Sequence, residues 1–448
     1  MEITPKLSVT EDKIRLLTVK TDMFKTACLT LNVLVPMGEY AAEYAVLSSY
    51  LVHSSKKYDS LIKLNSRLEE LYGALLSGSI SRHGENYRIQ LSITCIDDSL
   101  TFDGKSVTGA SLELLLSLLT KPSADENGFS PEQLSTEIRL TAEDIESEIN
   151  DKRSYAMTRM LETMCADEIY GLTKNEILEN VKKVTPQSLL AAWKFMLKNG
   201  IIQLNAIGNI SEDDCKKKLR EAFSDVGERT PYEPETVFVE EAEDLTELTE
   251  ELTMNQSKLV LGFRGGMTDE NDDFYSRRIM TDVFGGGPYS RLFMNVREKL
   301  SLCYYCSAAL FNSKGIVMVQ SGIEDANEEK AKNEIINQLR LTAEGEFSDE
   351  DYSSSIKSLT DTILGNSDTP EEITAWYASQ ILRGELKTPE AYAEEIRNVN
   401  RSEVVGAAKT IHRAESRYLM VFTISSLVIV ALGKKQHNEL YDKNEEKG

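Results

Sequence analysis

The sequence predicts an α+β protein made of two homologous halves, each a mostly antiparallel sheet with helices packed on it. Two observations lead to this prediction. The chain repeats its own order of elements, and within each copy short strands form hairpins between long amphipathic helices. Hairpins with helices segregated between them indicate one α/β layer per half. We expect the two halves to pack about a pseudo-twofold axis.

The strongest repeat joins residues 180–208 to residues 395–423, at a constant offset of 215 positions (395 minus 180). Within it, the apolar Leu204 corresponds to Leu419. In both copies a polar, N-cap-like residue precedes an amphipathic helix, and a strand follows. The segment therefore predicts the same helix-strand unit twice.

Two further matches follow the same order along the chain. "SRLEELYGALLSGS", from Ser66, corresponds to "SRLFMNVREKLSLC", from Ser290, and each predicts a helix followed by a hairpin. The strand "TACLTLNVLVPMG" and the helix around Tyr44 correspond to "QSKLVLGFRGGMT" and the helix around Tyr275. Three matches in one order indicate a duplication.

A proline-bearing and then strongly acidic segment separates the two copies, which is typical of a linker on the surface. We therefore predict a first half over residues 1–225, a linker over 226–252 and a second half over 253–448. Each half has the size of an ordinary domain.

The longest apolar run, "YLMVFTISSLVIVALG" at residues 418–433, has 16 residues with one Thr and two Ser inside. A span of the bilayer needs about 20 apolar residues, so a buried strand followed by a second apolar segment is the prediction. A C-terminal anchor is the alternative. The sequence offers no account of residues 425–448 beyond this.

The formal net charge of −23 argues against binding to nucleic acid or to an anionic membrane, because both need clustered Lys and Arg. No charged and then apolar leader opens the chain, which predicts a cytoplasmic location.

Six cysteines are scattered along the chain, which predicts reduced thiols rather than a disulfide framework: Cys28, Cys95, Cys165, Cys215, Cys303 and Cys306. The last two form a C-x-x-C in a predicted strand. A redox pair of this spacing usually lies at a helix N-terminus, so the strand context argues against a redox or metal function.

Residues 285–305, "GGGPYSRLFMNVREKLSLCYY", place three glycines before a helix, as many phosphate-binding loops do. Ser290 stands where a dinucleotide fingerprint needs its third glycine, and Arg291-Leu292 stand where a P-loop needs Lys-Ser/Thr. Gly285, Gly286 and Gly287 instead predict a tight turn or close passage of a peptide.

With these motifs in view, roughly residues 5–424 resemble the pitrilysin/insulinase family of inverzincin zinc peptidases, in its mitochondrial-processing-peptidase-like group. The resemblance rests on the duplicated halves, on "LEELYGALLSGS" with its hairpin, and on "GGGPYSRLFMNVREKLSLCYYCSAAL". In that family an H-x-x-E-H motif on the first long helix holds zinc and supplies the general base.

The motif is absent here. Tyr44, Leu47 and Ser48 occupy the places of the first His, the Glu and the second His, and no two of the four histidines stand at i and i+4. His53 is expected to face solvent or cap the helix. Glu146 and Glu148 resemble the stretch of the family's acidic ligand and are expected to be surface carboxylates.

The family's second-half signature includes an Arg and a Tyr seven residues apart that contact the peptide near the scissile bond. Arg297 and Tyr304 have this spacing. A permanently charged guanidinium and a phenol can together stabilise an oxyanion. The plain structural interpretation, a flanking charge and a half-buried strand residue, stays open, and Arg291 and Tyr305 are further candidates.

The resemblance implies a non-catalytic, substrate-binding subunit in a heterodimer with an H-x-x-E-H-bearing homologue that holds the zinc. This chain would bind peptides without a metal of its own in a bacterial cytoplasm. The alternative is a structural or peptide-binding protein with no peptidase partner. A separate catalytic activity in this chain has no supporting constellation of residues.

Overall fold

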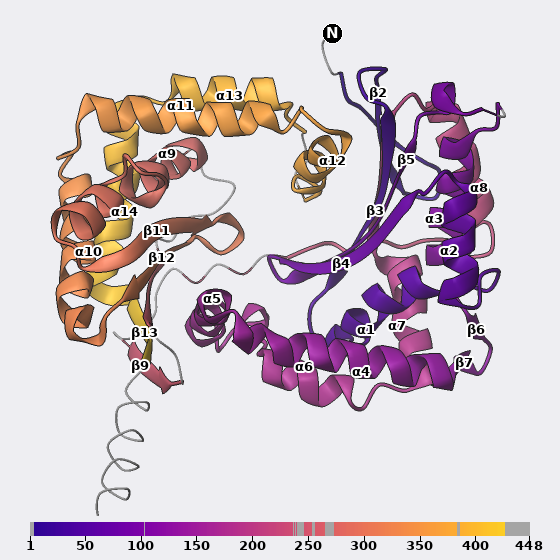
Figure 1. Cartoon of the computed structure of the whole chain (residues 1–448), viewed down its shortest axis with the longest axis horizontal. Coiled ribbons are helices and arrows are strands. Elements are labelled where there is room, and N and C mark those ends of the chain that lie inside the picture. Colours follow the sequence, from indigo (N-terminus) through magenta and orange to yellow (C-terminus); the bar gives the residue numbers. More distant parts are fainter. Residues whose placement is uncertain are drawn as a thin grey trace, which may run out of the picture. The chain divides into compact units, whose positions relative to one another are not determined.

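The computed structural model describes residues 4–102, 104–235, 237, 239, 246–252, 256–264, 273–382 and 386–425. Its contacts divide the chain into two compact units. Unit 1 contains Met1–Ser147, Leu172–Thr236 and Thr362–Tyr392, and unit 2 contains Glu148–Gly171, Val237–Asp361 and Ala393–Gly448. Each unit is therefore assembled from segments that are distant in the sequence (Figure 1).

Unit 1 is organised around a six-stranded sheet in the order β1-β2-β8-β3-β5-β4. All pairs are antiparallel except the parallel pair of β2 and β8. Its strands are β1 (Lys6–Val9), β2 (Arg15–Lys20), β3 (Thr26–Pro36), β4 (Leu75–His83), β5 (Asn86–Ile96) and β8 (Ile201–Gly208), and a small ribbon pairs β6 (Ala124–Asp125) with β7 (Gly128–Phe129).

The apolar face of this sheet packs against the main helices of unit 1. On β3, Leu29, Leu31 and Val33 point into this core and are fully buried. The helices of this unit are α1 (Ala41–His53), α2 (Leu61–Glu70), α3 (Val107–Thr120), α4 (Pro131–Ser147), α6 (Lys174–Val181), α7 (Pro186–Asn199) and α8 (Glu212–Phe223). The alternation of side chains along each strand thus places one apolar face inside.

The opposite face of the same sheet is polar, and helix α12 (Pro370–Ala378) contacts it at β3 and β8. Asn205 of β8 donates from Nδ2 to the carbonyl of Thr374 at 3.2 Å, and Thr94 of β5 donates to Glu371 at 2.7 Å. Figure 1 shows α12 across the sheet from α3 and α8. The first of these hydrogen bonds satisfies the amide of Asn205, which is fully buried.

Unit 2 repeats the same plan with a five-stranded sheet in the order β11-β12-β10-β13-β9. Its pairs are antiparallel except the parallel pair of β13 and β9. The strands are β9 (Thr246–Glu251), β10 (Ser257–Arg264), β11 (Cys303–Phe311), β12 (Ile316–Ile323) and β13 (Leu419–Ser425), and helices α9 (Phe274–Gly285), α10 (Glu328–Ala343) and α14 (Arg401–Tyr418) pack together beside this sheet. Helices α11 (Asp349–Gly365) and α13 (Pro389–Asn398) contain the points where the chain passes between units.

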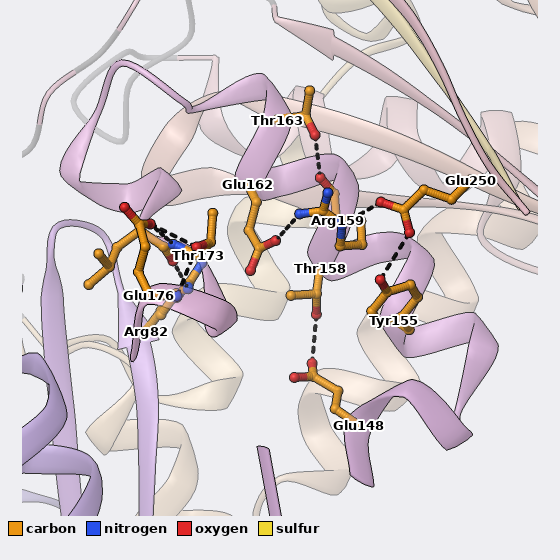
Figure 2. Close-up of polar contacts among 11 residues, drawn as sticks. Arg82, Glu148, Tyr155, Thr158, Arg159, Glu162, Thr163, Thr173, Glu176 and Glu250 are labelled. Atoms are coloured by element: carbon orange, nitrogen blue, oxygen red, sulfur yellow. Dashed lines mark hydrogen bonds and ion pairs between the residues drawn. The ribbon is translucent and has the colours of Figure 1, made fainter. Parts of the chain in front are cut away.

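Helix α5 (Lys152–Met164) belongs to unit 2, where it contacts β10 and β13. Arg159 links it to β9, because its guanidinium lies 2.8 Å from Glu250; within α5 the same guanidinium lies 2.6 Å from Glu162 (Figure 2). Burial lowers the pKa of Arg159, but the two carboxylates outweigh it and the net shift is upward. Tyr155 adds a hydrogen bond to Glu250 at 2.9 Å.

Helix α5, which contacts the sheet of unit 2, and helix α12, which contacts the sheet of unit 1, occupy equivalent places in the repeat. Adding the offset of 215 to the bounds of α5 gives 367 and 379 (152 plus 215 and 164 plus 215), and α12 lies inside this range. The first half of the sequence therefore supplies α5 to unit 2, and the second half supplies the equivalent helix, α12, to unit 1.

The fold class predicted from the sequence is confirmed, including the mostly antiparallel sheets and the duplicated order of elements. The end of the predicted linker forms β9, and the first half of the apolar C-terminal run forms β13. Residues 426–448 lie outside the described part of the chain. Among the described residues, no helix combines the length and apolarity needed to cross a bilayer.

Candidate functional site

The positions that correspond to the zinc motif lie on α1 and form part of the core of unit 1. Tyr44 and Leu47 are fully buried, and Ser48 is 6% exposed. The Ser48 hydroxyl donates to the carbonyl of Ala45 at 2.9 Å. Within the described ranges, no group of three or more His, Cys, Asp or Glu side chains is arranged to hold a metal ion.

Tyr44 fills this part of the helix with an aromatic ring. It packs edge-on against Tyr40 at 6.0 Å between centroids, and its hydroxyl is buried without a hydrogen-bond partner in the described structure. Burial strongly raises the pKa of Tyr44, so the phenol stays neutral. A neutral phenol, a leucine and a serine bound to its own helix do not fit a zinc ion.

The edge strand β4 runs directly beside these positions. A Cβ at Gly78 would lie 2.7 Å from the backbone oxygen of Ser48, so only glycine allows this approach of β4 to α1. Strand β4 is the last strand in the sheet order and pairs only with β5 among the described strands. Among the described strands, an unpaired strand edge thus lies next to the positions that correspond to the zinc motif.

The sequence reasoning about His53 was wrong. Its Nδ1 lies 2.8 Å from Oε1 of Glu137, and the Ser49 hydroxyl donates to the other oxygen of the same carboxylate at 2.7 Å. The hydrogen bond to the Glu137 carboxylate raises the pKa of His53. These contacts join α1 to α4, so His53 is neither a free surface histidine nor a simple cap.

Glu137 was missed from the sequence, although a signal existed. Leu134 and Glu137 are the buried residues of α4, three positions apart and hence on one face of the helix. A carboxylate on the apolar stripe needs partners, and α1 provides them. Glu146 is 55% exposed and lies 3.7 Å from Lys182, which confirms a surface carboxylate, whereas Glu148 accepts a hydrogen bond from Thr158 at 2.8 Å.

Arg297 and Tyr304 both lie on irregular backbone. Residues Phe293–Lys299 form a π-helix that carries Arg297. Ser301 has a left-handed conformation, with φ at 51°. The register of β11 against β12 then slips between Cys303 and Tyr305, so Tyr304 is the extra residue of a β-bulge. π-Helices, left-handed non-glycine residues and bulges are uncommon, and they are concentrated at functional sites.

Both side chains reach solvent. The Arg297 side chain is 40% exposed, and its guanidinium lies 4.5 Å from the centroid of the Phe293 ring. Tyr304 is 57% exposed, and its hydroxyl donates to Glu324 at 3.0 Å, which raises the pKa of Tyr304. Arg297 also lies 3.7 Å from Glu298, and both side chains are held by local contacts while they remain accessible.

The other residues singled out from the sequence have contacts within unit 2. Arg291 donates from Nε to Gln338 of α10 at 3.0 Å. The Tyr305 ring lies 4.6 Å from the guanidinium of Arg153 and 5.6 Å from the ammonium of Lys258. These contacts stabilise the packing of α10 and α5 in this unit, and Tyr305 is half-buried.

The three glycines allow close packing at the end of α9. A Cβ at Gly285 would lie 2.6 Å from the backbone nitrogen of Ala308 in β11, and one at Gly287 would lie 2.8 Å from the Tyr289 ring. Gly286 lines a pocket of about 240 Å³ together with Asp282 and Ala308. Contact of these glycines with a peptide stays a prediction.

Comparison with known proteins supports a common origin with zinc peptidases. Residues 183–359 match the family described as the Peptidase M16 inactive domain. The chain is 27% identical over 403 residues to the probable inactive metalloprotease YmfF of Bacillus subtilis, covering 90% of this chain and 94% of that protein. It is 25% identical over 219 residues to an uncharacterized zinc protease of Rickettsia bellii, covering 46% of this chain and 50% of that one.

Solved structures share the fold. A conserved protein from Enterococcus faecalis has a TM-score of 0.81 at 22% identity, and a peptidase M16 inactive domain from Pseudomonas fluorescens has a TM-score of 0.78 at 14% identity. Each comparison covers 94% of this chain and 98% of the other. Together with the duplicated fold, these matches show that the chain resembles the peptidase M16 proteins over most of its length, although its sequence lacks the H-x-x-E-H motif.

Proposed function

We propose that this chain is the non-catalytic, substrate-binding subunit of a heterodimeric zinc endopeptidase. The observation that supports it most directly is the contrast between the two halves. The zinc positions on α1 are filled by core side chains, whereas Arg297 and Tyr304 lie exposed on three successive backbone irregularities. A chain that kept only its fold would have no need for this irregular segment.

In this proposal Arg297 and Tyr304 act on a peptide held near the zinc of the partner subunit. The guanidinium is charged at every physiological pH, and the phenol donates a hydrogen bond, so both can stabilise negative charge that develops on a peptide carbonyl. The zinc would be held by an H-x-x-E-H-bearing homologue, because the residues at positions 44, 47 and 48 of this chain do not fit it.

Peptide binding would use the free edge of β4. Backbone N–H and C=O groups on an edge strand can pair with an extended peptide, and such pairing tolerates many sequences because it uses the main chain. The serines at alternate positions of β4, Ser77, Ser79 and Ser81, are small and polar. This edge strand lies beside Ser48, one of the positions that correspond to the zinc motif, so a peptide paired with it would lie near those positions.

The test is co-expression with the H-x-x-E-H homologue of the same organism, with association, zinc content and cleavage of extended peptides measured. We expect a complex in which cleavage needs both chains and zinc is bound by the homologue. Two chains that neither associate nor cleave together would refute the proposal and favour a structural or peptide-binding protein without a peptidase partner.

A further inference from the structure

The C-x-x-C of β11 has a geometry that a regular strand would not give it. On a regular strand, residues three apart lie about 10 Å from each other and point to opposite faces of the sheet. Here the bulge at Tyr304 absorbs one residue, so that Cys303 pairs with Ile323 and Cys306 pairs with Ser321. Ile323 and Ser321 are only two positions apart.

The bulge therefore gives Cys303 and Cys306 the spacing of residues two positions apart on a strand, and such residues lie on the same face of the sheet. Two residues of strand rise correspond to about 6.6 Å between their Cα atoms. Disulfides join residues whose Cα atoms lie about 4.4–6.8 Å apart. We propose that Cys303 and Cys306 are a dithiol that forms a reversible intramolecular disulfide by exchange with a low-molecular-weight disulfide such as oxidised glutathione.

The two thiols have different environments, which fits unequal roles. Cys303 is half-buried, and a hydrogen bond with Cys306 lowers its pKa against the opposing effect of burial, with Ser321 and the positive charge of Arg297 adding to the decrease. Cys306 is buried, and the same hydrogen bond together with burial raises its pKa. Cys303 is therefore the accessible, attacking thiol, and Cys306 is the resolving one.

The reaction balances as two exchange steps. The Cys303 thiolate attacks one sulfur of the small disulfide, the sulfur–sulfur bond breaks, and one small thiolate leaves and takes up a proton. Cys306 then loses its proton, attacks the Cys303 sulfur of the mixed disulfide, and releases the second small thiol. Two protein thiols are oxidised and one small disulfide is reduced to two thiols.

The pair lies within the irregular segment that carries Arg297 and Tyr304. A bond between Cys303 and Cys306 would close a loop across the bulge and fix the backbone at Tyr304, which lies between them. It would also remove the Cys303 thiol, whose pKa the positive charge of Arg297 helps to lower. The inference does not depend on the proposed function, because it concerns the chemistry of this chain alone.

The test is incubation of the folded, full chain in glutathione buffers of graded redox potential, followed by acid quenching, alkylation and peptide mass spectrometry. We expect the wild type to lose two hydrogen atoms from the peptide that contains both thiols. In Cys306→Ser we expect glutathione to remain attached to Cys303, because no resolving thiol is left. In Cys303→Ser we expect Cys306 to stay a free thiol. Under reducing conditions Cys303 should be alkylated roughly tenfold faster than the buried Cys165.

Three results would overturn the inference. One is a wild-type protein in which Cys303 keeps its glutathione and no internal disulfide forms. Another is a Cys306→Ser protein that remains unmodified under the same conditions, which would show that Cys303 is not accessible. The third is a disulfide that appears only after urea unfolds the chain, as followed by circular dichroism.

Discussion

The Nδ1 atom of His53 lies 2.8 Å from Oε1 of Glu137, and this contact joins the last turn of α1 to α4. The Ser49 hydroxyl, one helical turn before His53, binds the second oxygen of the same carboxylate. Side chains of α1 and α4 are thus linked by a buried carboxylate, on a helix whose corresponding residues hold zinc in the catalytic members of the family. We interpret Glu137 as a cross-brace that stabilises the helix pair without a metal.

Replacing Glu137 with Ala should lower the free energy of unfolding by about 1–3 kcal/mol, because Ser49 and His53 lose a buried acceptor. Urea denaturation followed by circular dichroism measures this change. The matched control is Glu146→Ala on the same helix, where a side chain 55% exposed should change the free energy by less than about 0.5 kcal/mol. Equal effects of the two substitutions would contradict the cross-brace.

The same contact predicts a pH dependence of stability. The folded-state pKa of His53 is raised above its unfolded value, so its contribution is fully present below the unfolded pKa of about 6.5 and is lost as the pH rises through the folded pKa. The difference in unfolding free energy between wild type and His53→Gln should therefore shrink as the pH rises above about 6.5. Urea denaturation at several pH values tests this, and a difference that stays constant with pH would refute it.

The duplicated order of strands was predictable because three segments with matching patterns occur twice, in the same order along the chain. Each copy supports the assignment of the other. The helix α5 and its equivalent α12 were predictable as helices, but their exchange between units was not. An amphipathic pattern predicts that a helix has a buried face, but it does not indicate which sheet covers that face.

The details of the site were less accessible to sequence reasoning. No residue pattern distinguishes the π-helix around Arg297 from an α-helix, since both bury one stripe of side chains. The bulge at Tyr304 depends on the register against β12, which is a long-range property. The same bulge places Cys303 and Cys306 opposite residues only two positions apart on β12, which their spacing in the sequence does not indicate. Glu137 was missed because its partners are more than eighty residues away.

Gly285 should not tolerate a methyl group. A Cβ at this position would lie 2.6 Å from the backbone nitrogen of Ala308, so α9 or β11 would have to move. We expect Gly285→Ala to lower the free energy of unfolding by about 1–3 kcal/mol. The control is Gly406→Ala in α14, where a Cβ meets nothing within 4 Å and the substitution should raise stability by about 0.5–1 kcal/mol. Thermal unfolding followed by circular dichroism compares them, and a stabilising Gly285→Ala would contradict the packing described here.

Arg297 and Tyr304 should matter for cleavage and not for assembly. In an active pair with the H-x-x-E-H homologue, Arg297→Ala and Tyr304→Phe should each lower kcat/KM by about 100-fold, because each removes one group that can stabilise an oxyanion. Arg297→Lys should restore part of the rate, since it keeps the charge but loses the planar guanidinium. Size-exclusion chromatography of each mixture reports whether the complex is intact.

Two control variants separate catalysis from packing in this experiment. Arg340→Ala removes another arginine of unit 2 whose side chain is 43% exposed, close to the 40% of Arg297, and it should leave the rate unchanged. Glu324→Gln weakens the hydrogen bond that holds the Tyr304 hydroxyl while keeping that hydroxyl, so it should lower the rate less than Tyr304→Phe. Wild-type rates for Arg297→Ala and Tyr304→Phe in an intact complex would remove both residues from the site. The π-helix and the bulge would then have to be explained by the packing of unit 2 alone.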